Sequence, residues 1–185
     1  ISGILYNLGY IEQNKLIEVS SKDLVAEYVG QTGPKTMSVI EKALGGVLFI
    51  DEAYSLAEGI GSGNSYNAEA IATLIQAMEN NRDNLVVIVA GYPKLMKNFI
   101  DSNPGLGSRF NRFVEFEDYN CNELLEIYEY ICKKSSYKID DEAKICLSEY
   151  INELLKNKDE SFGNARTIRN IFEKCIMFQA NRVMS

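Results

Sequence analysis

The sequence predicts an α/β protein in which a parallel sheet is followed by a small all-α domain. Residues 47–50 and 85–90 are apolar runs without polar alternation, a pattern typical of strands that are covered on both faces. Segments of helical periodicity separate these runs, and strands that alternate with helices indicate a parallel sheet. After Tyr119 the apolar residues follow helical spacing only. We therefore expect a sheet domain at residues 1–118 and a helical domain at residues 119–185.

The sequence of the first part of the chain predicts three helices and one strand. Residues 1–10 carry apolar side chains at helical spacing, and residues 16–20 form a short apolar segment that predicts a strand. Ser21 and the two residues after it offer an N-cap for a helix that runs to about Val29. After a loop with glycine and proline, residues 35–44 predict the next helix.

The middle of the chain continues this alternation. The strand at residues 47–50 is followed by a glycine-rich loop at residues 57–66 and by a helix at residues 68–80 with one apolar face. The apolar run at residues 85–90 predicts another strand, and alternating side chains at residues 112–116 predict a further, shorter one.

Amphipathic helices complete the chain. Their expected ranges are 121–135, 140–157 and 164–183, with Asn164 as the N-cap of the last one.

The composition limits the sites that the chain can carry. The formal net charge is −7, and an acidic surface repels phosphate backbones, so nucleic acid is not an expected partner. Histidine is absent, which excludes His-based triads and His-ligated zinc. No apolar run reaches the ~20 residues of a membrane span, so we expect no membrane partner. We expect reduced thiols and a cytoplasmic setting from four widely spaced cysteines: Cys121, Cys132, Cys146 and Cys175.

Two adjacent acids follow the strand at residues 47–50. Asp51 and Glu52 would lie at the carboxyl end of that strand, the edge where open α/β sheets bind ligands. One carboxylate can hold Mg²⁺ through its water shell while the next polarises an attacking water. This is the Walker B pattern of nucleotide triphosphatases. The alternative is a helix that begins here and carries acids in its first turn, where they are favoured electrostatically.

Five motifs in fixed order carry a family resemblance: LVAEYVGQTGPKT, GGVLFIDEAYSL, VVIVAGY, NPGLGSRF and FGNARTIRN. Together they resemble the AAA+ ATPases of the Rubisco activase-like (CbbX/CfxQ) clade, with the stage V sporulation protein K group of spore-forming bacteria as the most similar branch. The resemblance spans residue 1 to about residue 183. It implies a parallel AAA+ sheet that binds ATP and Mg²⁺ at its edge, a helical lid and hexameric rings.

The resemblance implies a role for each matching polar residue. Asp51 matches the Walker B acid that holds Mg²⁺ through water, and Glu52 matches the glutamate that activates the attacking water. Arg109 matches the arginine finger that reaches the ATP of a neighbouring subunit, with Arg112 as runner-up. The alternative for Arg109 is an ordinary surface arginine. Arg166 matches the second sensor on the lid, and an arginine in the first turn of a helix opposes the helix dipole, which favours a functional role over a merely basic helix.

Two further matches concern aromatic residues. Tyr28, Val29 and Gly30 match the aromatic–hydrophobic–glycine pore loop that grips a threaded polypeptide in a ring. The alternative is that Tyr28 packs as the last apolar residue of its helix. Tyr92 stands where many AAA+ proteins carry Asn or Thr as the first sensor, so this cofactor-binding role is assigned to it only loosely.

The P-loop signature G-x-x-x-x-G-K-[ST] does not occur in this sequence. That loop supplies backbone amides and a lysine for the phosphates and a hydroxyl for Mg²⁺. Residues 59–64 are glycine-rich but have no lysine, and they follow Asp51 instead of preceding it. In the related ATPases the P-loop directly precedes the helix that matches residues 1–10. We therefore expect that the chain begins just downstream of it, and that the chain alone binds ATP weakly and hydrolyses none measurably.

This absence also affects the expected sheet. In the family the P-loop strand lies between the strands that match residues 85–90 and 112–116. Without it, either a three-stranded sheet leaves residues 112–116 displaced, or a partner supplies a strand, because unpaired strand edges favour pairing. The sequence leaves both possibilities open.

The leading functional interpretation is an AAA+ ATPase fragment whose complete protein couples ATP hydrolysis to remodelling or threading of a protein partner in a hexameric ring. The alternative is a non-enzymatic scaffold derived from the same fold. A third interpretation, a clamp loader or helicase that acts on DNA, is disfavoured by the acidic pI of about 4.8. The identity of the protein partner does not follow from the sequence.

Overall fold

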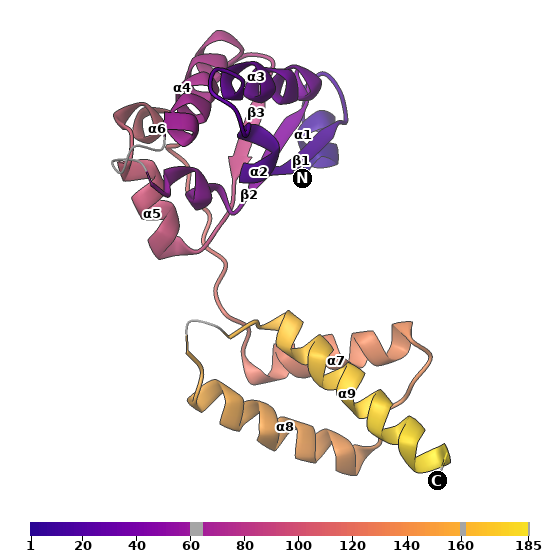
Figure 1. Cartoon of the computed structure of the whole chain (residues 1–185). Helices are drawn as coiled ribbons and strands as arrows, with labels where there is room; N and C mark the ends of the chain where they lie inside the picture. Colours follow the sequence, from indigo (N-terminus) through magenta and orange to yellow (C-terminus); the bar gives the residue numbers. More distant parts are fainter. Residues whose placement is uncertain (60–64, 160–161, 185) are drawn as a thin grey trace. The chain divides into compact units, whose positions relative to one another are not determined.

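The computed structural model describes residues 1–59, 65–159 and 162–184. The chain divides into two compact units, Ile1–Glu115 and Phe116–Ser185, each with its own hydrophobic core. The first unit carries the sheet and the second is helical (Figure 1). The glycine-rich loop expected at residues 57–66 lies in part outside the described residues, since residues 60–64 are not among them.

A parallel sheet forms the centre of the first unit. In the described residues its strands are β1 (Leu16–Ser20), β2 (Val47–Asp51) and β3 (Val86–Val89), in the order β1-β2-β3. Ser20 pairs with Asp51 and Ile50 pairs with Val89, so the carboxyl ends of all three strands meet at one edge. The predicted parallel α/β sheet is confirmed.

Helices pack around this sheet in Figure 1, and β2 between its two neighbours is the most buried strand. Leu48 and Ile50 on β2 are completely buried and share the core with Phe99. This burial is what the unbroken apolar run of the strand predicts. The helical elements are α1 (Ser2–Asn7), α2 (Ser21–Leu24), α3 (Thr32–Ala43), the 3₁₀ helix η1 (Ala53–Ala57), α4 (Ser65–Asn80), α5 (Pro93–Asp101) and α6 (Pro104–Arg109).

The strand predicted at residues 112–116 is wrong. These residues have no regular secondary structure in the described part of the chain, and Phe113 and Val114 are 76% and 79% exposed. An alternating pattern produces a strand only where a neighbouring strand offers its backbone N–H and C=O groups. β3 pairs with β2 alone, and residues 112–116 pair with none of the three strands. The described residues form a three-stranded sheet with this segment displaced, and a strand supplied by a partner stays a prediction.

The helix predicted from Ser21 to Val29 is also wrong in its length. Ser20 is the N-cap, in a capping box with Asp23, and the helix ends at Leu24. Side chains of α3 take the carbonyl groups that a longer helix would use. Thr36 Oγ1 donates to Leu24 O at 2.9 Å, and Lys35 Nζ donates to Val25 O at 2.7 Å.

The second unit confirms the predicted all-α domain. Its helices α7 (Cys121–Lys134), α8 (Asp141–Lys156) and α9 (Ala165–Met184) follow the predicted ranges closely. Two of them begin at side-chain caps: Asn120 forms a capping box with Glu123, and Asp140 accepts a hydrogen bond from the Ala143 amide. Leu124, Ile151 and Ile168, one from each helix, are buried together in the core.

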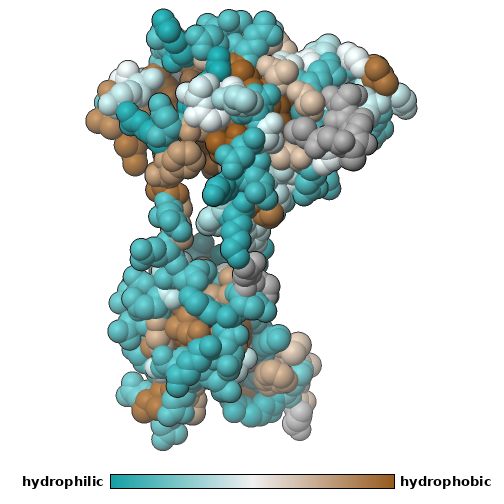
Figure 2. Space-filling model, turned by 90° about the vertical axis from the view of Figure 1, so that its left-hand side faces the viewer, coloured by the Kyte–Doolittle hydropathy of each residue, from teal (hydrophilic) through white to brown (hydrophobic). Residues whose placement is uncertain are grey.

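The face shown in Figure 2 is largely hydrophilic over the helical unit, with small hydrophobic patches. None of the described helices is both long enough and apolar enough to cross a membrane.

Candidate functional site

The two predicted acids lie at the carboxyl end of the central strand. Asp51 is the last residue of β2, and Glu52 follows it as the first residue outside the sheet; both are exposed. Glu52 has φ 49° and ψ 42°, a left-handed conformation that few non-glycine residues adopt. Its amide donates a 3.0 Å hydrogen bond to Asp51 Oδ1. The chain therefore turns sharply where it leaves the sheet and presents two neighbouring carboxylates to solvent.

The end of β3 is tied to this turn. The Ala90 amide donates to Ile50 O at 3.0 Å, and the Ala53 amide donates to Ala90 O at 3.1 Å. These bonds continue the pairing of β2 and β3 past the strand ends, so Gly91 and Tyr92 lie beside the turn at Glu52. Tyr92 is the N-cap residue of α5 and is 58% exposed. The structure thus brings Asp51, Glu52 and Tyr92 to one edge of the sheet.

Tyr54 joins these residues, although the sequence analysis did not single it out. Its ring packs against Tyr92 with 6.2 Å between centroids and 46° between planes. Burial raises the pKa of Tyr54, as do the charge of the nearby Glu52 carboxylate and a hydrogen bond between the two side chains. Tyr54 therefore lies close to Glu52 at this edge of the sheet. The signal in the sequence was the position of Tyr54, two residues after Glu52 in the same motif.

Gly91 makes room for this arrangement. A Cβ atom at position 91 would lie 2.6 Å from Tyr54 Cδ1 and 2.8 Å from Met96 Sδ, closer than side chains tolerate. The glycine of the GY pair thus lets the Tyr54 ring lie against the end of β3.

The donor set fits Mg²⁺ shared with a phosphate better than a metal cage made of protein. Mg²⁺ prefers oxygen ligands, keeps several waters and is usually held by one or two carboxylates together with phosphate oxygens. Asp51 and Glu52 supply exposed carboxylate oxygens. No group of three or more His, Cys, Asp or Glu side chains in the described ranges is arranged to hold a metal ion. These residues therefore suit a water-bridged ion that a triphosphate helps to hold.

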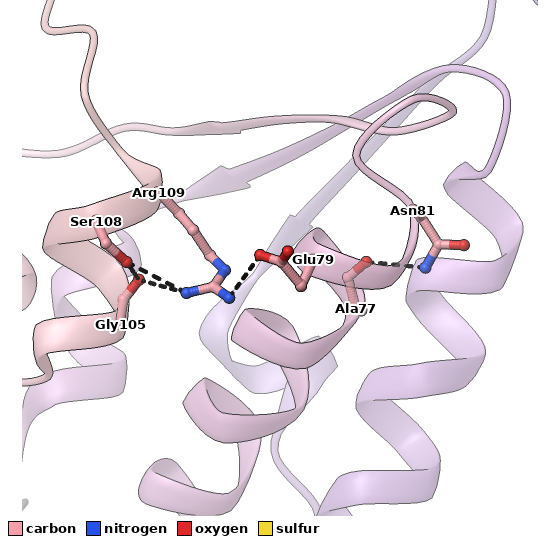
Figure 3. A network of polar contacts seen from close by, with 6 residues as sticks. All are labelled: Ala77, Glu79, Asn81, Gly105, Ser108 and Arg109. Atoms are coloured by element: carbon pink, nitrogen blue, oxygen red, sulfur yellow. Dashed lines mark hydrogen bonds and ion pairs between the residues drawn. The ribbon is translucent and has the colours of Figure 1, made fainter.

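The two candidate finger arginines differ in their surroundings. Arg109, the last residue of α6, points toward α4, where its Nη2 donates to Glu79 Oε2 at 2.8 Å (Figure 3). Its Nη1 donates to Gly105 O and to Ser108 Oγ, both at 3.2 Å. Arg112 is exposed and forms no hydrogen bond or ion pair with the part of the chain that the structure describes. The sequence analysis did not find Glu79, which lies 30 residues before Arg109.

Arg166 belongs to the helical unit. It is exposed in the first turn of α9, and its amide donates to Gly163 O at 2.8 Å. The predicted N-cap role of the Asn164 side chain is wrong. Asn164 has φ 47°, and its Oδ1 accepts a hydrogen bond from the Tyr119 amide instead of from the amides of α9. A residue in this left-handed conformation does not have the extended backbone of an ordinary N-cap.

The segment that matches the pore loop lies outside the helix that was expected to contain it. Tyr28 and Val29 are 67% and 82% exposed, and Gly30 has φ 75°. The base of the segment is fixed, since the Ala26 amide donates to Thr32 Oγ1 at 3.1 Å. The alternative in which Tyr28 packs as an apolar helix residue is not what the structure shows. Among the described residues, the side chain of Asp51 accepts a hydrogen bond from the Glu52 amide and none from residues 28–30.

Comparisons with known proteins agree with this fold. Residues 4–118 match the model of the ATPase family associated with various cellular activities (AAA), and residues 120–185 match the AAA lid domain. The solved structure of the FIGL-1 AAA domain in complex with ADP aligns with a TM-score of 0.62 at 17% identity, over 90% of this chain and 53% of that chain. This likeness concerns the fold.

Similar relatives carry the names CbbX and CfxQ, as the motif order predicted. The CbbX protein of Cereibacter sphaeroides is 45% identical over 185 residues, which are 100% of this chain and 59% of that protein. The CfxQ homologue of Galdieria sulphuraria is 46% identical over 185 residues, 100% of this chain and 60% of that protein. The CfxQ homologue of Trieres chinensis is 45% identical over 184 residues, 99% of this chain and 62% of that protein.

The chain thus spans about three fifths of these relatives, at 59% to 62% of their length. None of the three is named a sporulation protein, so the resemblance to the stage V sporulation protein K group stays a prediction. The match to the AAA model covers the sheet unit with Asp51 and Glu52, and the lid model covers the helical unit with Arg166. The chain belongs to the AAA family of ATPases.

Proposed function

We propose that this chain is the sheet and lid region of an ATPase that couples Mg²⁺-dependent ATP hydrolysis to the remodelling or threading of a protein partner in a hexameric ring. The observation that carries the proposal is the position of Asp51 and Glu52 at the carboxyl end of β2, beside Tyr92 at the end of β3. Open parallel sheets bind their ligands at this edge. We also place the protein in the cytoplasm.

The residues at this edge suit phosphoryl transfer to water. Asp51 would hold the waters of Mg²⁺, which when bound neutralises charge on the phosphates. Glu52 would accept the proton of the attacking water, and the Tyr54 hydroxyl would keep the Glu52 carboxylate oriented. Tyr92 would contact the nucleotide from the end of β3. Positive charge beside the transferring phosphoryl group would come from Arg166 on the lid and from Arg109 or Arg112 of a neighbouring subunit.

The exposed segment at Tyr28 and Val29 supports a polypeptide as the partner. Large apolar side chains that are 67% and 82% exposed on a fixed base can press on a chain of any sequence. In a ring, copies of this segment would line the central pore. Gly30 has φ 75°, a backbone conformation that residues with a Cβ atom adopt only rarely, and it turns the chain at this point.

The absence of a G-x-x-x-x-G-K-[ST] segment from this sequence gives the proposal a sharp test. We expect the full-length gene product to hydrolyse ATP and this chain alone to bind ATP weakly without measurable turnover. Glu52→Gln in the full-length protein should lower kcat by about 10²-fold or more, the contribution typical of a general base. Glu41→Gln is the matched control, because Glu41 is exposed near the end of α3, which leads into the amino end of β2, whereas Asp51 stands at its carboxyl end.

The test is read from ATP turnover, nucleotide binding and assembly size. Turnover by this chain alone that Glu52→Gln abolishes would overturn the inactivity of the isolated chain. A full-length product that contains the P-loop signature but neither binds nor hydrolyses ATP would overturn the proposed function. A gene product without that signature would favour the scaffold interpretation.

A further inference from the structure

The guanidinium of Arg109 is already occupied within its own subunit. It donates one hydrogen bond to Glu79 at 2.8 Å and two more, to Gly105 O and Ser108 Oγ, at 3.2 Å (Figure 3). Its Nε is buried and finds no hydrogen-bond partner among the described residues. Its side chain is only 24% exposed. Arg109 is therefore docked between α6 and α4.

This docked state conflicts with the role of a finger that contacts phosphate across a subunit boundary. An arginine has five N–H donors, and three are used here. Of the two that remain, one is on the buried Nε. Bidentate binding of a phosphate uses two parallel N–H donors that face the same direction, so it requires that at least one of these contacts is given up.

Glu79 is the contact most readily exchanged for phosphate. It is the only charged group of the three acceptors, and its side chain is 59% exposed at the end of α4. A phosphate that approaches Nη2 must replace this carboxylate, and while both are near they repel each other. Gly105 and Ser108 belong to α6 itself and move with Arg109.

We propose that Glu79 is a positioning residue that holds Arg109 in a docked state and competes with the phosphate of a neighbouring subunit's nucleotide for the guanidinium. The inference rests on the proposed function, in which Arg109 is a finger. Arg112, which is exposed and has no ion-pair partner in the described ranges, is not under this control. ATP turnover would then depend on how often Arg109 leaves Glu79.

The test compares ATP turnover of the full-length protein with its Glu79→Gln, Arg109→Ala and doubly substituted variants. Glutamine keeps the size of the side chain but removes the charge. We expect Glu79→Gln to raise kcat about two- to fivefold, the factor by which an ion pair of this exposure shifts a two-state equilibrium. KM for ATP should stay the same or fall, because the released guanidinium can also bind the phosphate of bound ATP. Arg109→Ala should lower kcat, and adding Glu79→Gln to it should have no further effect.

Glu41→Gln serves as the control for loss of one surface charge, and thermal unfolding confirms that each variant is folded. A purely structural Glu79 would give lower stability together with lower or unchanged kcat, which overturns the inference. A rise in kcat that persists without Arg109 overturns it as well. If the wild-type full-length protein has no ATPase activity, the proposed function fails and this inference fails with it, whereas an active wild type with an indifferent Glu79→Gln removes the inference alone.

Discussion

The side-chain amide of Asn164 donates a 2.6 Å hydrogen bond to Asp118, 46 residues earlier in the chain. The other Asp118 oxygen accepts a 2.7 Å ion pair from Lys158, and Asn164 Oδ1 accepts from the Tyr119 amide at 3.1 Å. The turn before α9 is thereby fixed to the segment before α7. α9 begins directly after Asn164, and Arg166 is its second residue. The contacts of Asn164 therefore fix the start of the helix that carries this candidate sensor.

The acid response of the helical unit should depend on Asp118. Hydrogen bonds from Lys158 and Asn164 hold the pKa of the Asp118 carboxyl below its usual range. A carboxyl with a lowered folded-state pKa stabilises the fold fully above its unfolded pKa, near 4, and this contribution is lost as the pH falls through the lowered value. We expect Asp118→Asn to lower the urea midpoint at pH 7 and to flatten its decline below about pH 4.

Urea unfolding between pH 7 and pH 2.5, followed by circular dichroism of the helices, measures this effect. Glu126→Gln is the control, because Glu126 is exposed on α7 and forms no ion pair in the described part of the unit. An Asp118→Asn variant that shows the wild-type dependence on pH would contradict the assignment.

The left-handed conformation of Asn164 gives a second prediction. Its φ of 47° costs an alanine about 1 kcal/mol, and alanine also loses the bonds to Asp118 and Tyr119, worth about 1 kcal/mol each. Asn164→Ala should therefore lower the free energy of unfolding by about 2–3 kcal/mol, and Asn164→Gly by about 1 kcal/mol less, since glycine adopts this conformation freely. Equal losses in chemical denaturation would show that the backbone conformation is not costly.

The sequence predicted the elements whose pattern is decided locally. The run from Val47 to Ile50 has no polar residue, and a strand of that kind is buried on both faces in whichever parallel sheet it joins. The helices of the second unit have amphipathic faces and local caps such as Asn120. The edge position of Asp51 and Glu52 follows from the same argument, since a strand that ends in acids exposes them at its end.

Features decided by distant residues were not predicted. Residues 112–116 have the alternation of a strand, but pairing depends on a neighbour, and β3 does not supply it. α2 ends at Leu24 because Lys35 and Thr36 on another helix take its carbonyl groups. The docking of Arg109 depends on Glu79, and the position of Asn164 depends on Asp118. The two residues of each pair are far apart in the sequence, and no fixed spacing in a single sequence predicts that they will meet.

Gly91 should be intolerant of substitution although it is exposed. A Cβ atom there would lie 2.6 Å from Tyr54 Cδ1 and 2.8 Å from Met96 Sδ, so Gly91→Ala must displace the Tyr54 ring. We expect a loss of about 1–3 kcal/mol in the free energy of unfolding, as in other overpacked sites. In the full-length protein kcat should fall too, because in the proposed function the Tyr54 hydroxyl orients the Glu52 carboxylate. Gly107→Ala is the control, since its nearest neighbour, Ile100 Cγ2, would be 3.8 Å away.

Tyr54→Ala separates the two causes of that loss. If the Gly91→Ala defect comes from the clash with the ring, adding it to Tyr54→Ala should lower stability by clearly less than it does alone. Additive losses in urea unfolding would place the cause elsewhere in the β3 to α5 connection.

The displaced segment at residues 112–116 should promote self-association of this chain. Phe113 and Val114 are 76% and 79% exposed and lie next to each other without strand partners, and exposed apolar segments of high strand propensity favour pairing between copies. Phe113→Ser should lower the apparent molar mass in concentration-dependent light scattering and change the free energy of unfolding by less than about 0.5 kcal/mol, because the side chain packs against little. Phe178→Ser is the control, because Phe178 is also a phenylalanine but lies on a helix, α9, where it is 65% exposed. If both variants reduce association to the same extent, general surface hydrophobicity is the cause and not the unpaired segment.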